Sequence, residues 1–166
     1  MALWKNGRFE ADNYVQVGDG ESLPDGAVIV TLERFLAERT ALTARNTPLG
    51  VLLQPSDDIT LLADDLPSLP LLALAFPKFG DGRAFSLARI ARERYGFKGE
   101  LRAVGDILFD RVAYMVRCGF DALDITNAPT VAALQAGRLP LSHEHYQPTG
   151  TDRAPADALK PWRRWA

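Results

Sequence analysis

Short apolar runs alternate with longer segments through most of the chain, and this pattern predicts strands alternating with helices. Each run has four to six residues, is rich in Val, Ile, Leu or Ala, and is bounded by Gly, Pro or polar residues, as buried strands are. The predicted strands are residues 27–30, 49–53, 71–76, 100–104 and 122–125. The segments that follow them have the length or periodicity of helices, and the predicted helices are residues 32–44, 59–65, 84–95, 107–118 and 131–136.

These five strand-to-helix steps fit into about 110 residues, and their connections are too long for hairpins. Connections of this kind join parallel strands through right-handed crossovers. We therefore expect an α/β fold with a mainly parallel sheet and about five βα units. The sheet is either open and doubly wound or a partial barrel.

The two ends of the chain depart from this alternation. Residues 2–17 predict a β-hairpin, because the pair Asn6-Gly7 readily adopts the two positive φ values of a type I′ turn. The segment beyond Leu139 loses periodicity, carries four prolines and predicts an irregular tail. The sequence therefore divides into an N-terminal hairpin and loop, an α/β core and a proline-bearing tail, at residues 1–26, 27–139 and 140–166.

Composition excludes several classes of protein. The chain has 166 residues, of which 47% are hydrophobic and 24% charged, and these values exclude general disorder. Its net charge of -2 excludes a bulk polycation. The single cysteine, Cys118, excludes dithiol exchange, a four-cysteine iron–sulfur cluster and a Cys/His zinc site, so the sequence identifies no cofactor or metal.

The N-terminal residues lack the apolar segment of a secretory signal, and the apolar run 71–76 is far too short to cross a bilayer. We therefore expect a cytoplasmic protein without a membrane partner.

Charge is unevenly distributed along the chain. Residues 1–77 hold five basic and eleven acidic residues, whereas residues 78–117 hold nine basic and five acidic ones. Of the 19 basic residues in the chain, 15 are Arg. The basic stretch is interpreted either as a region that contacts anions, because guanidinium groups match oxyanions, or as a bias toward Arg on solvated helix faces. It is not interleaved with aromatic residues on a recognisable nucleic-acid-binding module, so no nucleic acid is expected.

The loop after strand 71–76 is the first candidate site. In parallel α/β sheets, ligands bind at the carboxyl ends of the strands, where the N–H groups of helix N-termini converge. In this loop glycines allow close approach of backbone to a ligand, and basic and hydroxyl side chains surround the start of a helix. The candidate anion-binding residues are Lys78, Asp81, Gly82, Arg83 and Ser86. The alternative is an ordinary turn, in which Gly and Asp serve the backbone conformation.

Asp106 is the second candidate. It directly precedes a predicted helix, so it is either an N-cap or a carboxylate that orients a ligand or Arg83. In an enzyme, Asp106 would serve as acid or base, with Lys78 and Arg83 as electrostatic stabilisers. The C-terminal pair Trp162 and Trp165 predicts either a docking tail or a strap over the core.

Several motifs resemble one bacterial family. They are Phe76-Pro77-Lys78-Phe79, Asp81-Gly82-Arg83, Phe85-Ser86, Ala88-Arg89, the run 99–106 (GELRAVGD) and the run 117–121 (RCGFD). This combination resembles the domain-of-unknown-function 934 family, whose members are labelled oxidoreductases of sulfite reduction. The resemblance implies a role in sulfur assimilation beside sulfite reductase, although the hydride-cofactor fingerprint and redox cysteines are absent.

We therefore expect an accessory protein of assimilatory sulfate and sulfite reduction. Its expected partner is a small oxyanion, an anionic cofactor, sulfite reductase itself or another enzyme of the pathway, bound through residues 78–86 and Asp106. The alternative is the enzyme described above, with its active site at the carboxyl ends of the strands.

Overall fold

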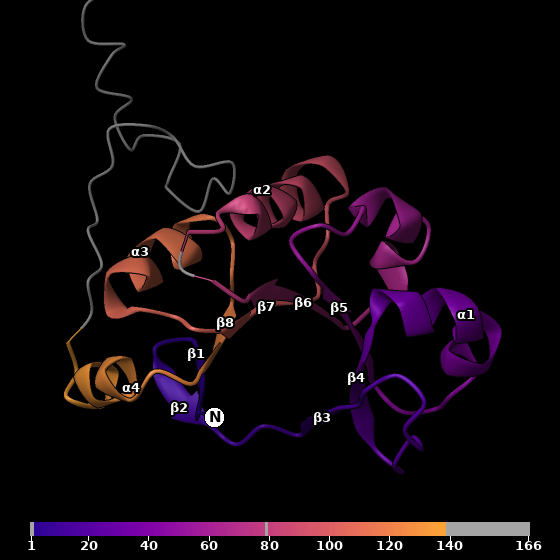
Figure 1. Cartoon of the computed structure of the whole chain (residues 1–166), viewed down its shortest axis with the longest axis horizontal. Helices are drawn as coiled ribbons and strands as arrows, with labels where there is room; N and C mark the ends of the chain where they lie inside the picture. Colours follow the sequence, from indigo (N-terminus) through magenta and orange to yellow (C-terminus); the bar gives the residue numbers. More distant parts are fainter. Residues whose placement is uncertain (1, 79, 139–166) are drawn as a thin grey trace, which may run out of the picture.

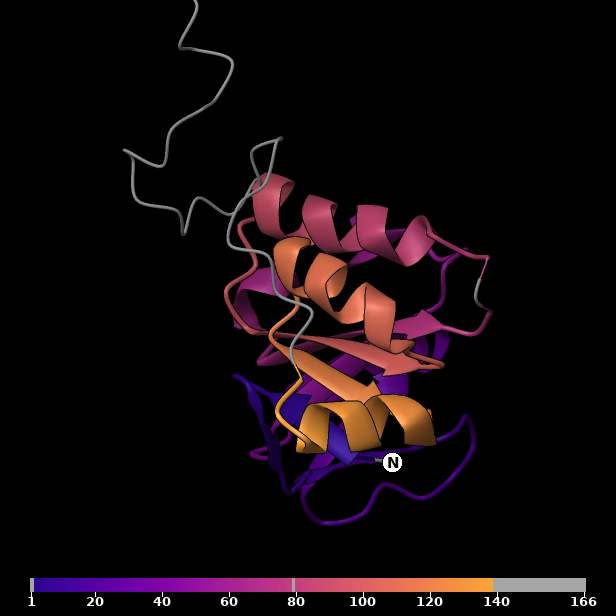
Figure 2. The same ribbon diagram turned by 90° about the vertical axis from the view of Figure 1, so that its left-hand side faces the viewer.

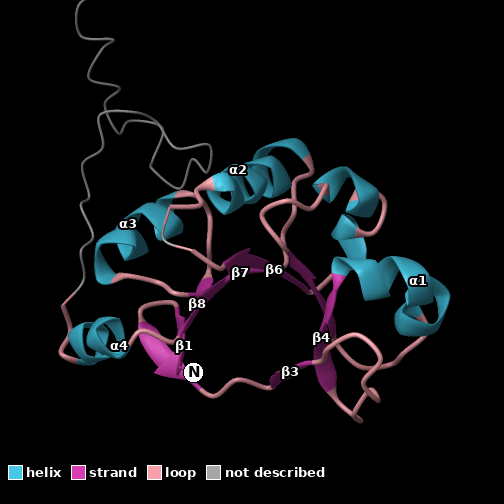
Figure 3. Cartoon of the chain, viewed as in Figure 1, coloured by secondary structure: helices cyan, strands magenta, loops and turns pink. Residues whose placement is uncertain are grey.

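The computed structural model describes residues 2–78 and 80–138. These residues form one eight-stranded sheet that curls into a half barrel, with helices along its outer, convex side (Figures 1 and 3). The tail predicted for residues 140–166, including Trp162 and Trp165, lies outside the described residues.

The strand order across the sheet is β2-β1-β8-β7-β6-β5-β4-β3. The strands are β1 (Ala2–Lys5), β2 (Arg8–Glu10), β3 (Tyr14–Gln16), β4 (Ala27–Thr31), β5 (Leu49–Leu53), β6 (Leu71–Phe76), β7 (Glu100–Gly105) and β8 (Ala122–Ile125). The α-helices are α1 (Leu32–Thr43), α2 (Arg83–Arg89), α3 (Phe109–Arg117) and α4 (Ala128–Gln135). Two 3₁₀ turns, η1 (Ile59–Leu62) and η2 (Leu66–Ser68), follow β5, and a π-helical turn, η3 (Ile90–Arg94), continues α2.

The α/β class and the partial barrel are confirmed, but the sheet is mixed rather than mainly parallel. Strands β3 to β8 run parallel, whereas β1 is antiparallel to both β2 and β8. The antiparallel pairs arise because the N-terminal hairpin joins the same sheet. The prediction of five βα units is not confirmed, since 3₁₀ turns replace the α-helix predicted for residues 59–65.

The predicted turn of the hairpin is confirmed. Asn6 and Gly7 have φ values of 50° and 86°, as a type I′ turn requires. The second half of the segment 2–17 behaves differently, because Tyr14–Gln16 leaves the hairpin and pairs with β4 at the opposite edge of the sheet. Residues 11–13 therefore span the open side of the half barrel, between the two edge strands.

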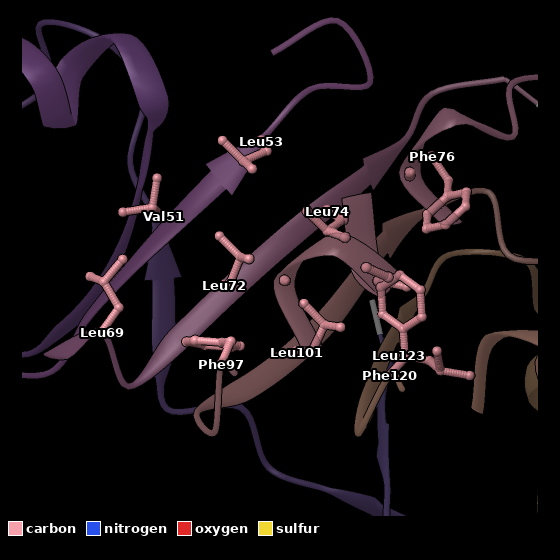
Figure 4. Close-up of a cluster of buried hydrophobic side chains, with 14 of the residues drawn as sticks. Val51, Leu53, Leu69, Leu72, Leu74, Phe76, Phe97, Leu101, Phe120 and Leu123 are labelled. Carbon is pink, nitrogen blue, oxygen red and sulfur yellow. The ribbon is translucent and has the colours of Figure 1, made fainter. Parts of the chain in front are cut away.

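The main core lies between the convex face of the sheet and the helices. Alternate residues of the central strands point toward the helices and pack with side chains from the connecting loops, such as Leu69, Phe97 and Phe120 (Figure 4). Figure 2 shows α2 and α3 side by side over the sheet, and the rings of Phe85 and Tyr114 join them with centroids 4.8 Å apart. Burial of this apolar face supplies the main stabilisation of the fold.

A smaller apolar cluster lies on the concave face. It consists of Ile29, Leu52, Leu71, Ala73 and Ala75, with Tyr14 and Val104 packed against it. The buried strands carry apolar residues on both faces, which explains why they read as continuous apolar runs in the sequence.

The first residues of two helices differ from the predictions. Helix α4 begins at Ala128, three residues earlier than predicted, because Asn127 caps it and Pro129 fits its first turn. Helix α3 begins at Phe109 rather than at residue 107, with Leu108 at its N-cap. None of the helices in the described part of the chain is both long enough and apolar enough to cross a membrane.

Candidate functional site

The carboxyl ends of the parallel strands form one rim of the half barrel, and the site residues predicted from the sequence lie on it. Lys78 and residues 80–82 follow β6, and α2 begins at Arg83. Asp106 follows β7, and Asn127 follows β8. Since β6, β7 and β8 are neighbours in the sheet, these loops are adjacent at the rim.

An ion pair within the loop fixes the start of α2. The Asp81 carboxylate accepts a hydrogen bond from the Arg83 backbone N–H at 3.1 Å, and from Nε and Nη2 of its guanidinium at 3.0 and 2.7 Å. This is the bidentate geometry of strong Arg–carboxylate pairs. The hydrogen bonds from the side chain and then the backbone of Arg83 lower the pKa of Asp81 to about 2. Asp81 thus already neutralises Arg83, for which the sequence predicts an external anion.

Lys78 is different, because its side chain makes no hydrogen bond or ion pair with the other described residues, while its carbonyl accepts a hydrogen bond from the Asp81 N–H at 3.2 Å. Its side chain is exposed, and so is Ser86 within the first turn of α2. Gly82 occupies the N-cap position of α2 and makes no side-chain cap. The loop therefore presents two exposed cations, of which Arg83 is paired with Asp81 and Lys78 is not paired with any described residue.

Asp106 is exposed, and its interpretation as a helix cap is wrong, because α3 begins beyond Leu108. Its backbone N–H donates to the carbonyl of Phe76 at 3.3 Å, which ties the loop to β6. Its Oδ1 accepts a hydrogen bond from Asn127 Nδ2 at 3.5 Å, the long limit for such a contact. The structure thus brings Asp106 together with Asn127, and no contact in the described residues joins it to Lys78 or Arg83.

The polar residues that follow β8 have structural partners. Asn127 Oδ1 accepts hydrogen bonds from the N–H and hydroxyl of Thr130 at 3.1 and 2.9 Å, so Asn127 caps α4. The Thr126 hydroxyl donates to the carbonyl of Gly105 at 3.0 Å and joins β8 to β7. These contacts hold the rim in shape.

A second polar cluster, which the sequence analysis does not single out, lies on the concave face. Arg102 lies between Leu101 and Ala103, which pack toward the helices, so its side chain projects to the opposite face of β7. Arg102 is only 1% exposed. The members of this concave-face cluster are Lys5, Asp12, Tyr14, Glu100, Arg102 and Asp124.

Two carboxylates hold the Arg102 guanidinium. Its Nη1 contacts Asp12 Oδ2 at 2.7 Å, and its Nε and Nη2 contact Glu100 Oε1 at 2.8 and 2.7 Å. The other oxygen of Glu100 accepts a hydrogen bond from Lys5 Nζ at 2.6 Å. The guanidinium carbon also lies 5.4 Å from the centre of the Tyr14 ring, within the range of a cation–π contact.

Asp124 lies on the same face, opposite Val104 in the register of β7 and β8. It is 7% exposed. Burial raises the pKa of its carboxyl, the negative charge of Asp12 raises that pKa further, and the Arg102 charge partly opposes both effects. Burial also raises the pKa of the Tyr14 phenol.

The sequence contains a signal for this cluster. Arg102 and Asp124 each lie inside an otherwise apolar strand, and a charged residue there predicts a polar position on the opposite face of the sheet. The partners Lys5, Asp12 and Tyr14 carry no such signal, because they come from the N-terminal segment and reach the cluster only when the sheet curls.

The remaining candidate for chemistry is Cys118, whose thiol forms a hydrogen bond with the Tyr114 side chain. Cys118 is buried at the end of α3, and burial raises the pKa of its thiol, which makes it a poor nucleophile. In residues 2–78 and 80–138, no three His, Cys, Asp or Glu side chains gather as metal ligands.

The fold and the rim define an α/β half-barrel protein whose candidate polar groups lie at the carboxyl ends of its parallel strands. The chain belongs to the family described as "Bacterial protein of unknown function (DUF934)", which it matches over residues 50–156. The family resemblance is therefore confirmed. The matched region includes the rim loop 78–86, Asp106 and Arg102. No curated protein and no solved structure matches the chain.

Proposed function

We propose that this protein is a cytoplasmic accessory protein of assimilatory sulfate and sulfite reduction, and that it docks sulfite reductase through the rim loop 78–86. One observation carries the proposal. The loop presents the Lys78 side chain, which is exposed and has no ion pair among the described residues, beside an Arg83 whose position is fixed by Asp81. A fixed loop with exposed charge suits an electrostatic contact with an acidic surface.

Exposure favours a protein partner over a small oxyanion at this loop. Lys78, Arg83 and Ser86 are all exposed, and water screens a single ion pair at such a position strongly. Summed over the charges of a protein interface, the same cations steer association and fix its orientation. The link with sulfite reduction comes from the family resemblance in the sequence, since the family itself is described as one of unknown function.

The alternative of an enzyme gains less support. It requires Asp106 as acid or base close to Lys78 and Arg83, whereas Asp106 is exposed and its only side-chain contact among the described residues is with Asn127. A carboxylate in this exposed position lacks the water-excluding surroundings that an active site provides.

The test is co-purification with sulfite reductase at near-physiological salt. The double variant Lys78→Ala/Arg83→Ala should lose the complex, because both rim cations are removed. Arg8→Ala/Lys98→Ala is the matched control, since it removes an exposed Arg and an exposed Lys away from this loop. Retention of the complex by the rim variant, or equal loss with the control, would contradict rim docking.

A calorimetric titration with sulfite, sulfate and phosphate distinguishes docking of sulfite reductase from binding of a small oxyanion at the loop 78–86. If rim docking is correct, Arg83→Ala leaves the heats of all three titrations unchanged. Saturable binding of any of these anions that Arg83→Ala abolishes would instead assign the loop to a small oxyanion.

A further inference from the structure

The Arg102 guanidinium is the most deeply buried charge in the described residues, and its two carboxylate partners differ in how firmly they are held. Glu100 lies on β7 itself, is also bound by Lys5, and its side chain is 13% exposed. The Asp12 side chain is 30% exposed and comes from the connection between β2 and β3. Asp12 is therefore the partner that can leave Arg102 without disturbing a central strand.

The segment that carries Asp12 is weakly anchored. It joins the two edge strands of the sheet, and β3, which follows it, has only three residues and pairs with β4 alone. Residues 11–13 are exposed. Apart from strand pairing, the segment is held by the Asp12 ion pair with Arg102, by the Tyr14 ring against the same guanidinium and against the concave-face apolar cluster, and by a local bond from the Tyr14 N–H to Asp12. Segments with so few contacts open at low free-energy cost.

The neighbours of Arg102 along the sheet are small, although its own side chain is buried. The residues directly opposite it on the two adjacent strands are Ala73 on β6 and Ala122 on β8, and each presents a single methyl group. The charged and titratable groups of the cluster are Glu100, Lys5, Asp12, Tyr14 and Asp124. Glu100 bridges both cations, so an anion in place of Asp12 restores the same charge balance.

We propose that the concave face holds an anion-binding site centred on Arg102, in which the Asp12 carboxylate occupies the ligand's position and moves aside when a small oxyanion binds. The ligand class is a carboxylate, sulfite or sulfate, because these groups accept the hydrogen bond that Nη1 now donates to Asp12 at 2.7 Å. Residues 11–14 move outward as the ligand enters, so binding couples to the conformation of the open side of the half barrel.

This site is separate from the rim loop of the proposed function. Lys78→Ala and Arg83→Ala should leave binding at Arg102 unchanged, and loss of binding at Arg102 should leave docking at the rim unchanged. The failure of either proposal can therefore be recognised independently of the other.

The first test is calorimetric titration with sodium sulfate at constant ionic strength maintained with chloride. Asp12→Asn keeps the size of the side chain and an acceptor for the Tyr14 N–H but removes the competing charge. The introduced Asn side chain would compete less strongly with sulfate for Arg102, because its hydrogen bond to the guanidinium no longer involves a negative charge. Asp12→Asn should therefore bind sulfate about tenfold more tightly than the wild type. Glu10→Gln is the matched control, since the Glu10 side chain is also 30% exposed and pairs with Arg8 instead.

The double variant Asp12→Asn/Arg102→Gln should lose the tenfold gain. A gain that persists in this double variant, an equal gain in Glu10→Gln, or no gain in Asp12→Asn would each overturn the proposal. Thermal unfolding of each variant verifies that it is folded before titration.

A second measurement uses the wild type alone and does not depend on how the variants fold. Amide hydrogen exchange is compared in sulfate and in chloride of equal ionic strength. Sulfate generally strengthens burial and slows exchange, whereas displacement of Asp12 should speed exchange in residues 10–16 specifically. Unchanged or slower exchange in that segment would overturn the proposal.

Discussion

The arginines of the basic stretch 78–117 have partners inside the chain, and this limits the charge available to a ligand. Arg83 pairs with Asp81, Arg89 pairs with Glu93, and Arg102 lies between Asp12 and Glu100. Arg92 contacts Asp121 and also donates to three backbone carbonyls, at Phe97, Gly99 and Gly119. Part of the positive excess of the sequence is therefore neutralised locally, whereas the exposed side chains of Lys78 and Lys98 have no ion pair among the described residues.

The Asp81 carboxyl should titrate far below an ordinary aspartate. Its pKa is about 2, whereas an unperturbed Asp has a pKa of about 3.9. Because the folded value is the lower one, the pair with Arg83 stabilises the loop above the ordinary pKa, and this contribution disappears as the pH falls through about 2. Carbon-detected NMR of the Asp81 carboxyl measures the midpoint directly.

Two variants separate the causes of this shift. Arg83→Ala should return the Asp81 midpoint to the ordinary range, because the side-chain hydrogen bonds are the largest cause of the shift. Lys78→Ala should leave it nearly unchanged, since Lys78 acts only through its more distant charge. An ordinary midpoint in the wild type would show that the pair does not persist in solution.

At the level of elements, the strands can be predicted because each apolar run is continuous and is bounded by Gly, Pro or polar residues. Strands β5, β6 and β8 have the predicted bounds, and β4 and β7 extend one residue further. Strand β3 was not predicted, because its edge position leaves Val15 and Gln16 exposed and gives it no apolar run. The 3₁₀ turns after β5 resemble a short helix in sequence, since Asp58 caps the first turn as it would cap a helix.

The Gly105-Asp106 element shows why the candidate site was predicted only in part. The strand alternation placed Asp106 at the carboxyl end of β7, as observed. Its contacts depend on the close approach of β7 to β6, which a sequence does not specify. Gly105 has a φ of 127°, and a Cβ there would lie 2.5 Å from the carbonyl oxygen of Phe76. Gly105 permits this close approach, and three further residues precede the start of α3 at Phe109.

Gly105→Ala should therefore destabilise the protein by about 1–3 kcal/mol, because a residue with a Cβ must either adopt a strained φ or displace the Phe76 carbonyl. Gly80→Ala is the matched control in the neighbouring loop, where an added Cβ meets no atom within 4 Å. It should change stability by less than about 0.5 kcal/mol. Urea unfolding measures both values, and equal effects would mean that the Gly105 backbone relaxes without cost.

At the scale of the whole molecule, the two candidate sites have different origins. The parallel order of β6, β7 and β8 brings the rim loops onto one edge of the sheet, whereas curvature of the sheet lets the N-terminal segment reach Arg102 across the open side (Figure 1). Curvature accumulates over eight strands, so no local pattern in the sequence decides between an open sheet and a half barrel. The sequence therefore does not distinguish an open sheet from a partial barrel.

The same topology bears on whether residues 1–26 form a separate unit, as the sequence division suggests. Strand β1 pairs with β8 over four residues, and Trp4 is 4% exposed within the main core cluster. Removing a large aromatic side chain from such a position costs about 3–5 kcal/mol, which is a large part of the usual stability of a domain.

Trp4→Ala should therefore lower the urea midpoint of the entire chain, in a single transition that is followed by far-ultraviolet circular dichroism. Val15→Ala, at a side chain that is 53% exposed, should change it little. If amide exchange in Trp4→Ala instead accelerates only in residues 2–10 while β6 keeps its protection, the hairpin is an independent appendage, and the half barrel folds without it.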